Sequence, residues 1–141
     1  MKDDVPFPSR EIVERGVEKG IEWFLYKNRI GAINGYVKLP EGHKWFGLSY
    51  DDVPVKVHGG LTYGGSGSKF IGFDTNHGGD YWENGDDYFR LFAANWVVRV
   101  WDQDQVVKEV KHLARQVAKN VSLWRKVMRF FEKHNEGSYM D

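Results

Sequence analysis

The strongest constraint on the fold is a run of apolar residues at helical spacing in the C-terminal third of the chain. Its members, with charged residues between them, are Val106, Val110, Leu113 and Val117. This spacing predicts a helix that buries one face. Asp102, with Gln105 three residues later, resembles a capping box at the start of that helix. Such a helix needs a second apolar surface on which to pack.

A second apolar run follows Asn120-Val121-Ser122, where the chain can break or bend. The run consists of Leu123, Trp124, Val127, Met128, Phe130 and Phe131. The two runs together predict C-terminal helices over residues 103–134. The breadth of the second apolar face indicates burial on two sides, as in a homo-oligomer.

The surface that these helices could cover comes from residues 21–74, which are mainly strand-like. Strand-forming residues bounded by turn signals predict four strands, at residues 21–26, 30–39, 53–63 and 70–74. We expect a flexible segment over residues 1–8 and a short helix, capped by Ser9, over residues 10–19. The sequence thus predicts a single α+β domain over residues 1–141, with an antiparallel sheet of about four strands packed by C-terminal helices.

Charge and composition exclude several classes of protein. The chain carries 20 basic and 20 acidic residues, whereas proteins that bind a long phosphate backbone are usually strongly basic. A long nucleic acid is therefore disfavoured as a partner, although a small anion is not. No stretch approaches the roughly 18 apolar residues of a membrane span. The absence of cysteine excludes a thiol nucleophile, and with the polar N-terminus it favours an intracellular protein.

Two of three candidate groups precede the predicted fourth strand. Adjacent carboxylates in Tyr50-Asp51-Asp52 can bind a cation or raise one another's pKa, or they can form a solvated turn. In His58-Gly59-Gly60-Leu61-Thr62, a histidine precedes glycines whose backbone amides can cradle an anion. The alternative for this second group is a bulge near a sheet edge.

The third group is Asp74, His77 and Asp80, spaced by three residues where a strand runs into a glycine-rich loop. Two carboxylates and an imidazole can bind a divalent cation, with His58 as a further ligand. Equally, His77 can act as a general base oriented by an aspartate. The spacing matches no established metal-site pattern, so the sequence assigns no metal ligands, and the group can also be a simple hairpin loop.

These groups can approach one another in a meander of strands. The predicted ligand-binding residues are Tyr50, Asp51, Asp52, His58, Gly59, Gly60, Thr62, Asp74, His77, Asp80 and Trp82. If the chain is an enzyme, the predicted catalytic residues are His58, Asp74, His77 and Asp80. Imidazoles, amides and stacking rings suit a compact ligand with a phosphate and a planar base, and they would also suit a hydrolytic site.

The order of these motifs resembles a family of small uncharacterised proteins of bacteriophages and bacteria. The resemblance is carried by Gly35-Tyr36-Val37, Pro40 to His43, Tyr50-Asp51-Asp52-Val53, Val57 to Tyr63, Ile71 to Asp74, His77 to Asp80 and Leu113 to Gln116. It covers roughly residues 33–118 and implies that His58, Asp74, His77 and Asp80 are the first site candidates. It also implies a phage-encoded protein in the bacterial cytoplasm. The family has no established activity, so no reaction is implied.

Three functions stay open from the sequence. The leading hypothesis is a protein that binds a small nucleotide-like ligand, in a phage to sequester a host immune signal. The second is a small hydrolase of a nucleotide or phosphoester, with or without a divalent metal. The third is a protein-binding inhibitor that uses the apolar face of residues 123–131.

Overall fold

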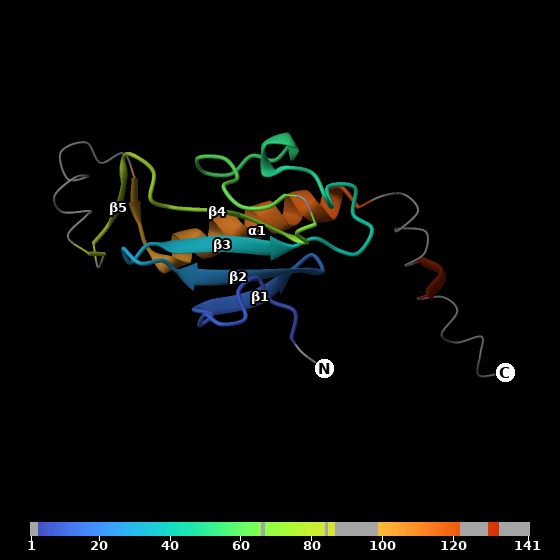
Figure 1. Ribbon diagram of the computed structural model, residues 1–141, viewed down its shortest axis with the longest axis horizontal. Coiled ribbons are helices and arrows are strands. Elements are labelled where there is room, and N and C mark those ends of the chain that lie inside the picture. The colour runs from blue at the N-terminus through green and yellow to red at the C-terminus, as the bar shows by residue number, and fades with distance from the viewer. Residues whose placement is uncertain (1–2, 66, 84, 87–98, 122–129, 133–141) are drawn as a thin grey trace.

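An antiparallel sheet with a long helix packed on one face forms the centre of the molecule (Figure 1). The computed structural model describes residues 3–65, 67–83, 85–86, 99–121 and 130–132. Within them, no helix is both long enough and apolar enough to cross a membrane.

The sheet contains four strands in the order β1-β2-β3-β4, each antiparallel to its neighbour. Their bounds are Glu14–Glu18 for β1, Ile21–Lys27 for β2, Ile33–Lys38 for β3 and Phe70–Phe73 for β4. The predicted α+β class and the antiparallel sheet of about four strands are therefore confirmed. Three of the strands lie where the sequence predicts them.

Helix α1 spans Gln103–Lys119 and buries the predicted apolar stripe against the sheet. Its capping box is present: the Asp102 side chain accepts from the Gln105 N–H, and the Gln105 side chain accepts from the Asp102 N–H. Figure 1 shows α1 running behind the sheet along the strands. The prediction of this helix and of its first residue is confirmed.

Alternation along β2 divides the aromatic residues between two cores. Trp23 and Leu25 pack with α1, whereas Phe24 and Tyr26 pack on the opposite face, as a strand with a side-chain period of two requires. That opposite face is covered by Phe7, whose ring lies 5.0 Å from the ring of Tyr26 in an edge-on contact. The N-terminal segment expected to be flexible is therefore packed at Phe7.

The helix predicted over residues 10–19 is wrong, because β1 occupies this stretch. Lys19 (φ 52°) and Gly20 (φ 80°) form a two-residue connection to β2, and positive φ at both central positions is typical of a tight hairpin. Gly16 lies opposite Trp23, and a Cβ at Gly16 would lie 2.5 Å from the indole ring. Gly16, which would weaken a helix, instead makes room for the Trp23 ring on the neighbouring strand.

The strand predicted over residues 53–63 is also wrong. Only Tyr63 forms a β-bridge, to Gly72. The preceding residues lie against α1 instead, where the Gln116 side chain accepts from the Lys56 N–H at 2.8 Å and donates to the Lys56 carbonyl at 2.9 Å. Side chains of the helix thus satisfy backbone groups that a neighbouring strand would otherwise pair.

A second, parallel pair of strands was not predicted. It consists of β5 (Asp80–Trp82) and β6 (Arg99–Trp101), at the end of the molecule where Figure 1 labels β5. A short 3₁₀ helix, η1, covers Tyr50–Asp52. The second predicted C-terminal helix lies outside the described residues, apart from residues 130–132.

Replacing Gly35 with alanine should destabilise the sheet–helix interface. An added Cβ would lie 2.7 Å from the Phe73 ring and 3.1 Å from Val110 Cβ, and overpacking of this kind costs about 1–3 kcal/mol. Urea denaturation should show a lower midpoint with an unchanged slope. Gly20→Asn is the control, since nothing lies within 4 Å of that Cβ position and asparagine tolerates positive φ. An equal midpoint for Gly35→Ala and the natural sequence would contradict the packing.

Candidate functional site

The Asp80 carboxylate is the centre of a hydrogen-bonded cluster at the start of β5. It is only 2% exposed. Its Oδ1 accepts from Trp101 Nε1 at 2.9 Å and from His58 Nε2 at 2.7 Å. Its Oδ2 accepts from the His77 N–H at 2.9 Å and lies 3.2 Å from His77 Nδ1. Two imidazoles and one indole therefore converge on a single buried carboxylate.

His58 reaches this carboxylate from the segment that lies along α1. Its backbone N–H donates to Glu109 Oε1 at 2.8 Å. Glu109 lies seven residues before Gln116, and so both side chains extend from the same side of the helix. The His58 ring also contacts the Trp101 ring, with centroids 4.9 Å apart. The helix thus fixes the backbone of His58, whereas Asp80 on β5 and Trp101 on β6 fix its ring.

His77 lies between two carboxylates on the loop from β4 to β5. Its Nδ1 faces Asp80, and its Nε2 lies 3.2 Å from Asp74 Oδ1. That second contact lacks hydrogen-bond geometry, and Nε2 is buried with no hydrogen-bond partner among the residues that the structure describes. The ring lies directly over Gly59, where a Cβ would be 2.3 Å from it. A glycine at position 59 is therefore required for this ring position.

Buried polar contacts hold the His77 loop in place. The Thr75 N–H donates to Asn34 Oδ1 at 3.1 Å, and the Thr75 hydroxyl donates to the Ile33 carbonyl at 2.8 Å. The Trp82 indole donates to the Thr75 carbonyl at 3.1 Å. Because β3 and β5 both bind Thr75, the neighbouring Asp74 and His77 have fixed backbone positions.

Asp80 is ionised at neutral pH. Burial alone would raise its pKa, but the hydrogen bonds from Trp101, His58 and the His77 N–H outweigh burial and hold the pKa below the usual 3.8. An ionised carboxylate only accepts hydrogen bonds. His58 Nε2 and His77 Nδ1 therefore both carry protons in this arrangement. Of the other two nitrogens, Nδ1 of His58 is left for proton transfer, whereas Nε2 of His77 is buried beside Asp74.

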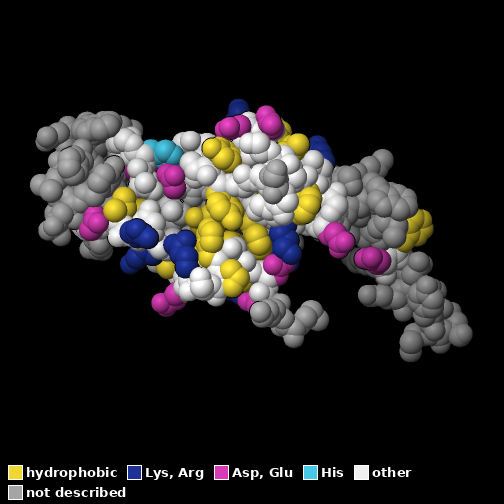
Figure 2. All heavy atoms as spheres, in the orientation of Figure 1, with side chains coloured by type: hydrophobic (Ala, Val, Ile, Leu, Met, Phe, Trp, Pro, Cys, Tyr) yellow, Lys and Arg dark blue, Asp and Glu magenta, His cyan; other side chains and the backbone are white. Residues whose placement is uncertain are grey.

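The structure brings together four predicted site residues, namely His58, Asp74, His77 and Asp80. Figure 2 shows histidine side chains beside acidic ones at the surface, toward the end of the molecule where β5 lies. The cluster is thus accessible from one side, with the His58 and His77 side chains 24% and 30% exposed.

Other predicted ligand-binding residues lie elsewhere. Tyr50 and Thr62 line a separate hollow of about 410 Å³, together with Tyr63, Gly64, Gly65 and Ser68. Asp51 and Asp52 are exposed in η1. Within the part of the chain that the structure describes, neither makes a hydrogen bond or ion pair with the histidine cluster.

The amides expected to cradle an anion after His58 are largely occupied. The Gly60 N–H donates to the Val57 carbonyl at 3.0 Å, and the Thr62 N–H donates to the Gly72 carbonyl at 2.9 Å. Trp82, predicted as a stacking surface, is 6% exposed, and its ring lies parallel to that of Trp101 at 6.5 Å. In this structure, these amides and the Trp82 ring are engaged within the protein.

Sequence reasoning missed Trp101 and Glu109, which support the cluster from β6 and α1. Trp101 lies 21 residues after Asp80, and Glu109 lies 51 residues after His58. No spacing rule links such positions. The sequence gives one indication for Glu109. It lies outside the apolar stripe of the predicted helix, so its side chain is expected to point away from the sheet, toward solvent or another segment.

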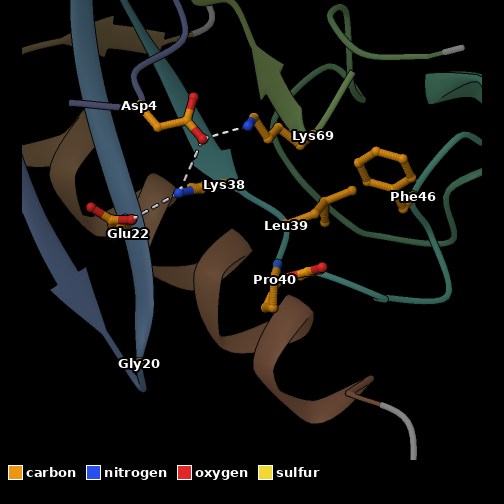
Figure 3. Close-up of a pocket in the computed structure, with 9 residues that line it drawn as sticks. Asp4, Gly20, Glu22, Lys38, Leu39, Pro40, Phe46 and Lys69 are labelled. Carbon is orange, nitrogen blue, oxygen red and sulfur yellow. Dashed lines mark ion pairs between the residues drawn. The ribbon is translucent and has the colours of Figure 1, made fainter. Parts of the chain in front are cut away.

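A hollow of about 600 Å³ elsewhere is lined by charged residues, among them Asp4, Glu22, Lys38 and Lys69 (Figure 3). Lys38 Nζ lies 3.2 Å from Asp4 Oδ2 and 3.7 Å from Glu22 Oε2. Lys69 Nζ lies 2.5 Å from the same Asp4 oxygen. Because carboxylates already neutralise both lysines, this hollow offers a phosphate little net positive charge.

No protein-family model, curated protein or solved structure matches the chain.

Replacing Asp80 with asparagine should destabilise the fold by about 3 kcal/mol at neutral pH, because an amide turns a donor toward groups that need an acceptor. The folded-state pKa is lowered, so the stability that ionised Asp80 contributes is present above about pH 3.8 and is lost as the pH falls through the lower folded-state value. Urea denaturation across pH should show the difference between the two proteins shrinking on the acid side. The exposed Asp104→Asn is the control, and a pH-independent difference would contradict the assignment.

Proposed function

We propose that the chain is a small hydrolase of a nucleotide or another compact phosphoester, with its centre at His58, Asp80 and His77. The observation that carries the proposal is the convergence of two imidazoles on one buried, ionised carboxylate. A carboxylate in this position fixes the tautomer and orientation of a histidine, which is its role beside general bases in many hydrolases.

Each histidine has one defined nitrogen for activating water or moving a proton. Asp80 holds the Nε2 proton of His58, which leaves Nδ1 as an acceptor. His77 directs Nε2 toward Asp74 at 3.2 Å. When both nitrogens of His77 are protonated, a rotation of the ring would bring the Nε2 proton within reach of a leaving oxygen. A base on one side and a proton donor on the other are the requirements of hydrolysis.

The charges around the centre favour a compact substrate. Asp74, Asp80 and Glu109 place three carboxylates within the cluster, and the chain has no net charge with which to hold a long phosphate polymer. A single phosphodiester carries one negative charge and is repelled less than a phosphomonoester dianion. A cyclic or dinucleotide phosphodiester is therefore the substrate class best suited to the site.

A second candidate function is the capture of a nucleotide-like ligand without turnover. It is favoured by the hollow of about 410 Å³, whose lining includes two predicted ligand-binding residues, Tyr50 and Thr62. Tyr63, with its ring against Tyr36, gives this hollow an aromatic wall, and Gly64 and Gly65 leave backbone accessible. In a phage such a protein would sequester a host signal.

Replacing His77 with alanine should abolish turnover while ligand binding persists. The loss should be about 100- to 10,000-fold, the usual contribution of a positioned acid or base. Turnover is measured with bis(p-nitrophenyl) phosphate and a panel of cyclic nucleotides, with products identified by mass spectrometry. His112→Ala is the matched control, because His112 is exposed on α1.

Full turnover in the His77→Ala protein would remove His77 from the mechanism. A ligand that co-purifies and is released intact on denaturation, with no product from any member of the panel, would instead establish capture.

A further inference from the structure

Three potential metal-binding atoms meet at the centre of the candidate site. One nitrogen each from His58 and His77 and one oxygen from Asp80 lie within 4.8 Å of one another. Ligand atoms around a tetrahedral zinc ion are separated by roughly 3.4 Å, and Asp80 Oδ2 lies 3.0 Å from His58 Nε2 and 3.2 Å from His77 Nδ1. Small rotations of the side chains are therefore enough to place all three around a single ion.

When the proton of His77 is on Nδ1, the other ring nitrogen, Nε2, is left without a hydrogen bond among the described residues. In that state, the buried lone pair of Nε2 faces the Asp74 carboxylate at 3.2 Å, and no described part of the chain offers it a hydrogen-bond partner. A cation at Nδ1 removes the proton from that nitrogen and leaves the remaining proton on Nε2, where it faces the Asp74 carboxylate in place of a lone pair. A small rotation of the ring would then give the contact hydrogen-bond geometry. Histidines that bind metals usually donate their second N–H to a carboxylate in this way.

Neighbouring groups also hold the other two proposed ligands, Asp80 and His58, in position. Trp101 Nε1 donates to Oδ1 of Asp80 and the His77 N–H donates to Oδ2, which together orient the carboxylate. Oδ2 keeps a second lone pair with which to bind an ion. Glu109 fixes the backbone of His58, and Gly59 makes room for the His77 ring. Outer contacts of this kind hold metal ligands in place before the ion arrives.

The negative charge of the cluster also favours binding of a cation. Three carboxylates, from Asp74, Asp80 and Glu109, surround two imidazoles. An anionic phosphoester could approach such a group more easily with a divalent cation present. The donor set of two imidazoles and one carboxylate suits zinc and similar transition metals, whereas magnesium and calcium prefer oxygen ligands.

We propose that His58 Nε2, His77 Nδ1 and Asp80 Oδ2 bind one divalent transition-metal ion, with the remaining positions open to water and substrate. This inference rests on the proposed function and names how the same site activates water. A bound ion lowers the pKa of its water and polarises the phosphoryl oxygen. With the ion in place, direct proton transfer by the imidazoles is no longer required.

The test is metal binding by the full-length chain after treatment with EDTA. Titration with Co²⁺ should produce visible d–d absorption bands, and calorimetry with Zn²⁺ should give one ion per chain. His58→Gln and His77→Gln should each weaken Zn²⁺ binding by more than roughly 100-fold, beyond the loss caused by removing an outer contact. The exposed His112→Gln is the matched control and should bind as the natural sequence does.

Circular dichroism and urea denaturation check that each variant is folded. If the natural sequence binds neither ion, or if both glutamine variants bind Zn²⁺ with unchanged affinity, the metal site is wrong. These outcomes do not depend on the stability of any one variant, because the first is measured on the unmodified chain.

Turnover separates this inference from the proposed hydrolase. Hydrolysis that continues at full rate in EDTA would overturn the metal site and leave the hydrolase standing. Stoichiometric metal binding by His58 and His77 without hydrolysis of any phosphoester would leave the metal site standing and overturn the hydrolase.

Discussion

Burial of the apolar stripe of α1 against β2 and β3 is the interaction on which the rest of the molecule depends. Val106, Val110 and Leu113 are completely buried in this contact, and full burial of one such side chain contributes about 1.5–3 kcal/mol. The same helix extends Glu109 and Gln116 toward residues 53–58 and binds their backbone. One face of α1 therefore stabilises the sheet while another positions His58.

The elements that the sequence predicts correctly are those in which one periodicity dominates. The stripe and capping box of α1 follow from local spacing, and β2, β3 and β4 are rich in strand-forming residues. The failures depend on distant partners. Gly16 is explained by the Trp23 ring on the next strand, and the extended backbone at Lys56 is paired by a glutamine 60 residues away. Such contacts leave no local pattern.

The residues of the candidate site likewise fall into those that the sequence indicates and those that only the fold reveals. His58, Asp74, His77 and Asp80 could be selected from their chemistry, because imidazoles and carboxylates beside glycines form a limited set of arrangements. The supporting residues could not be selected in this way. Without the fold, Trp101 is expected to be a core residue and Glu109 a solvated residue of a helix. Tyr50 and Thr62 belong to the same motif string, yet they line another hollow. Proximity in sequence did not imply a shared site.

The position of Trp101 immediately before the N-cap Asp102 has a consequence for how the protein can change over evolution. Trp101 is joined to the start of α1, and Glu109 lies on the helix itself. A change in core packing that shifts α1 would therefore displace both of these supports of the site. A shift of the helix therefore affects the sheet core and the candidate site together. Substitutions should cost less stability at exposed positions of the helix, such as His112, than on its buried stripe or at its first turn.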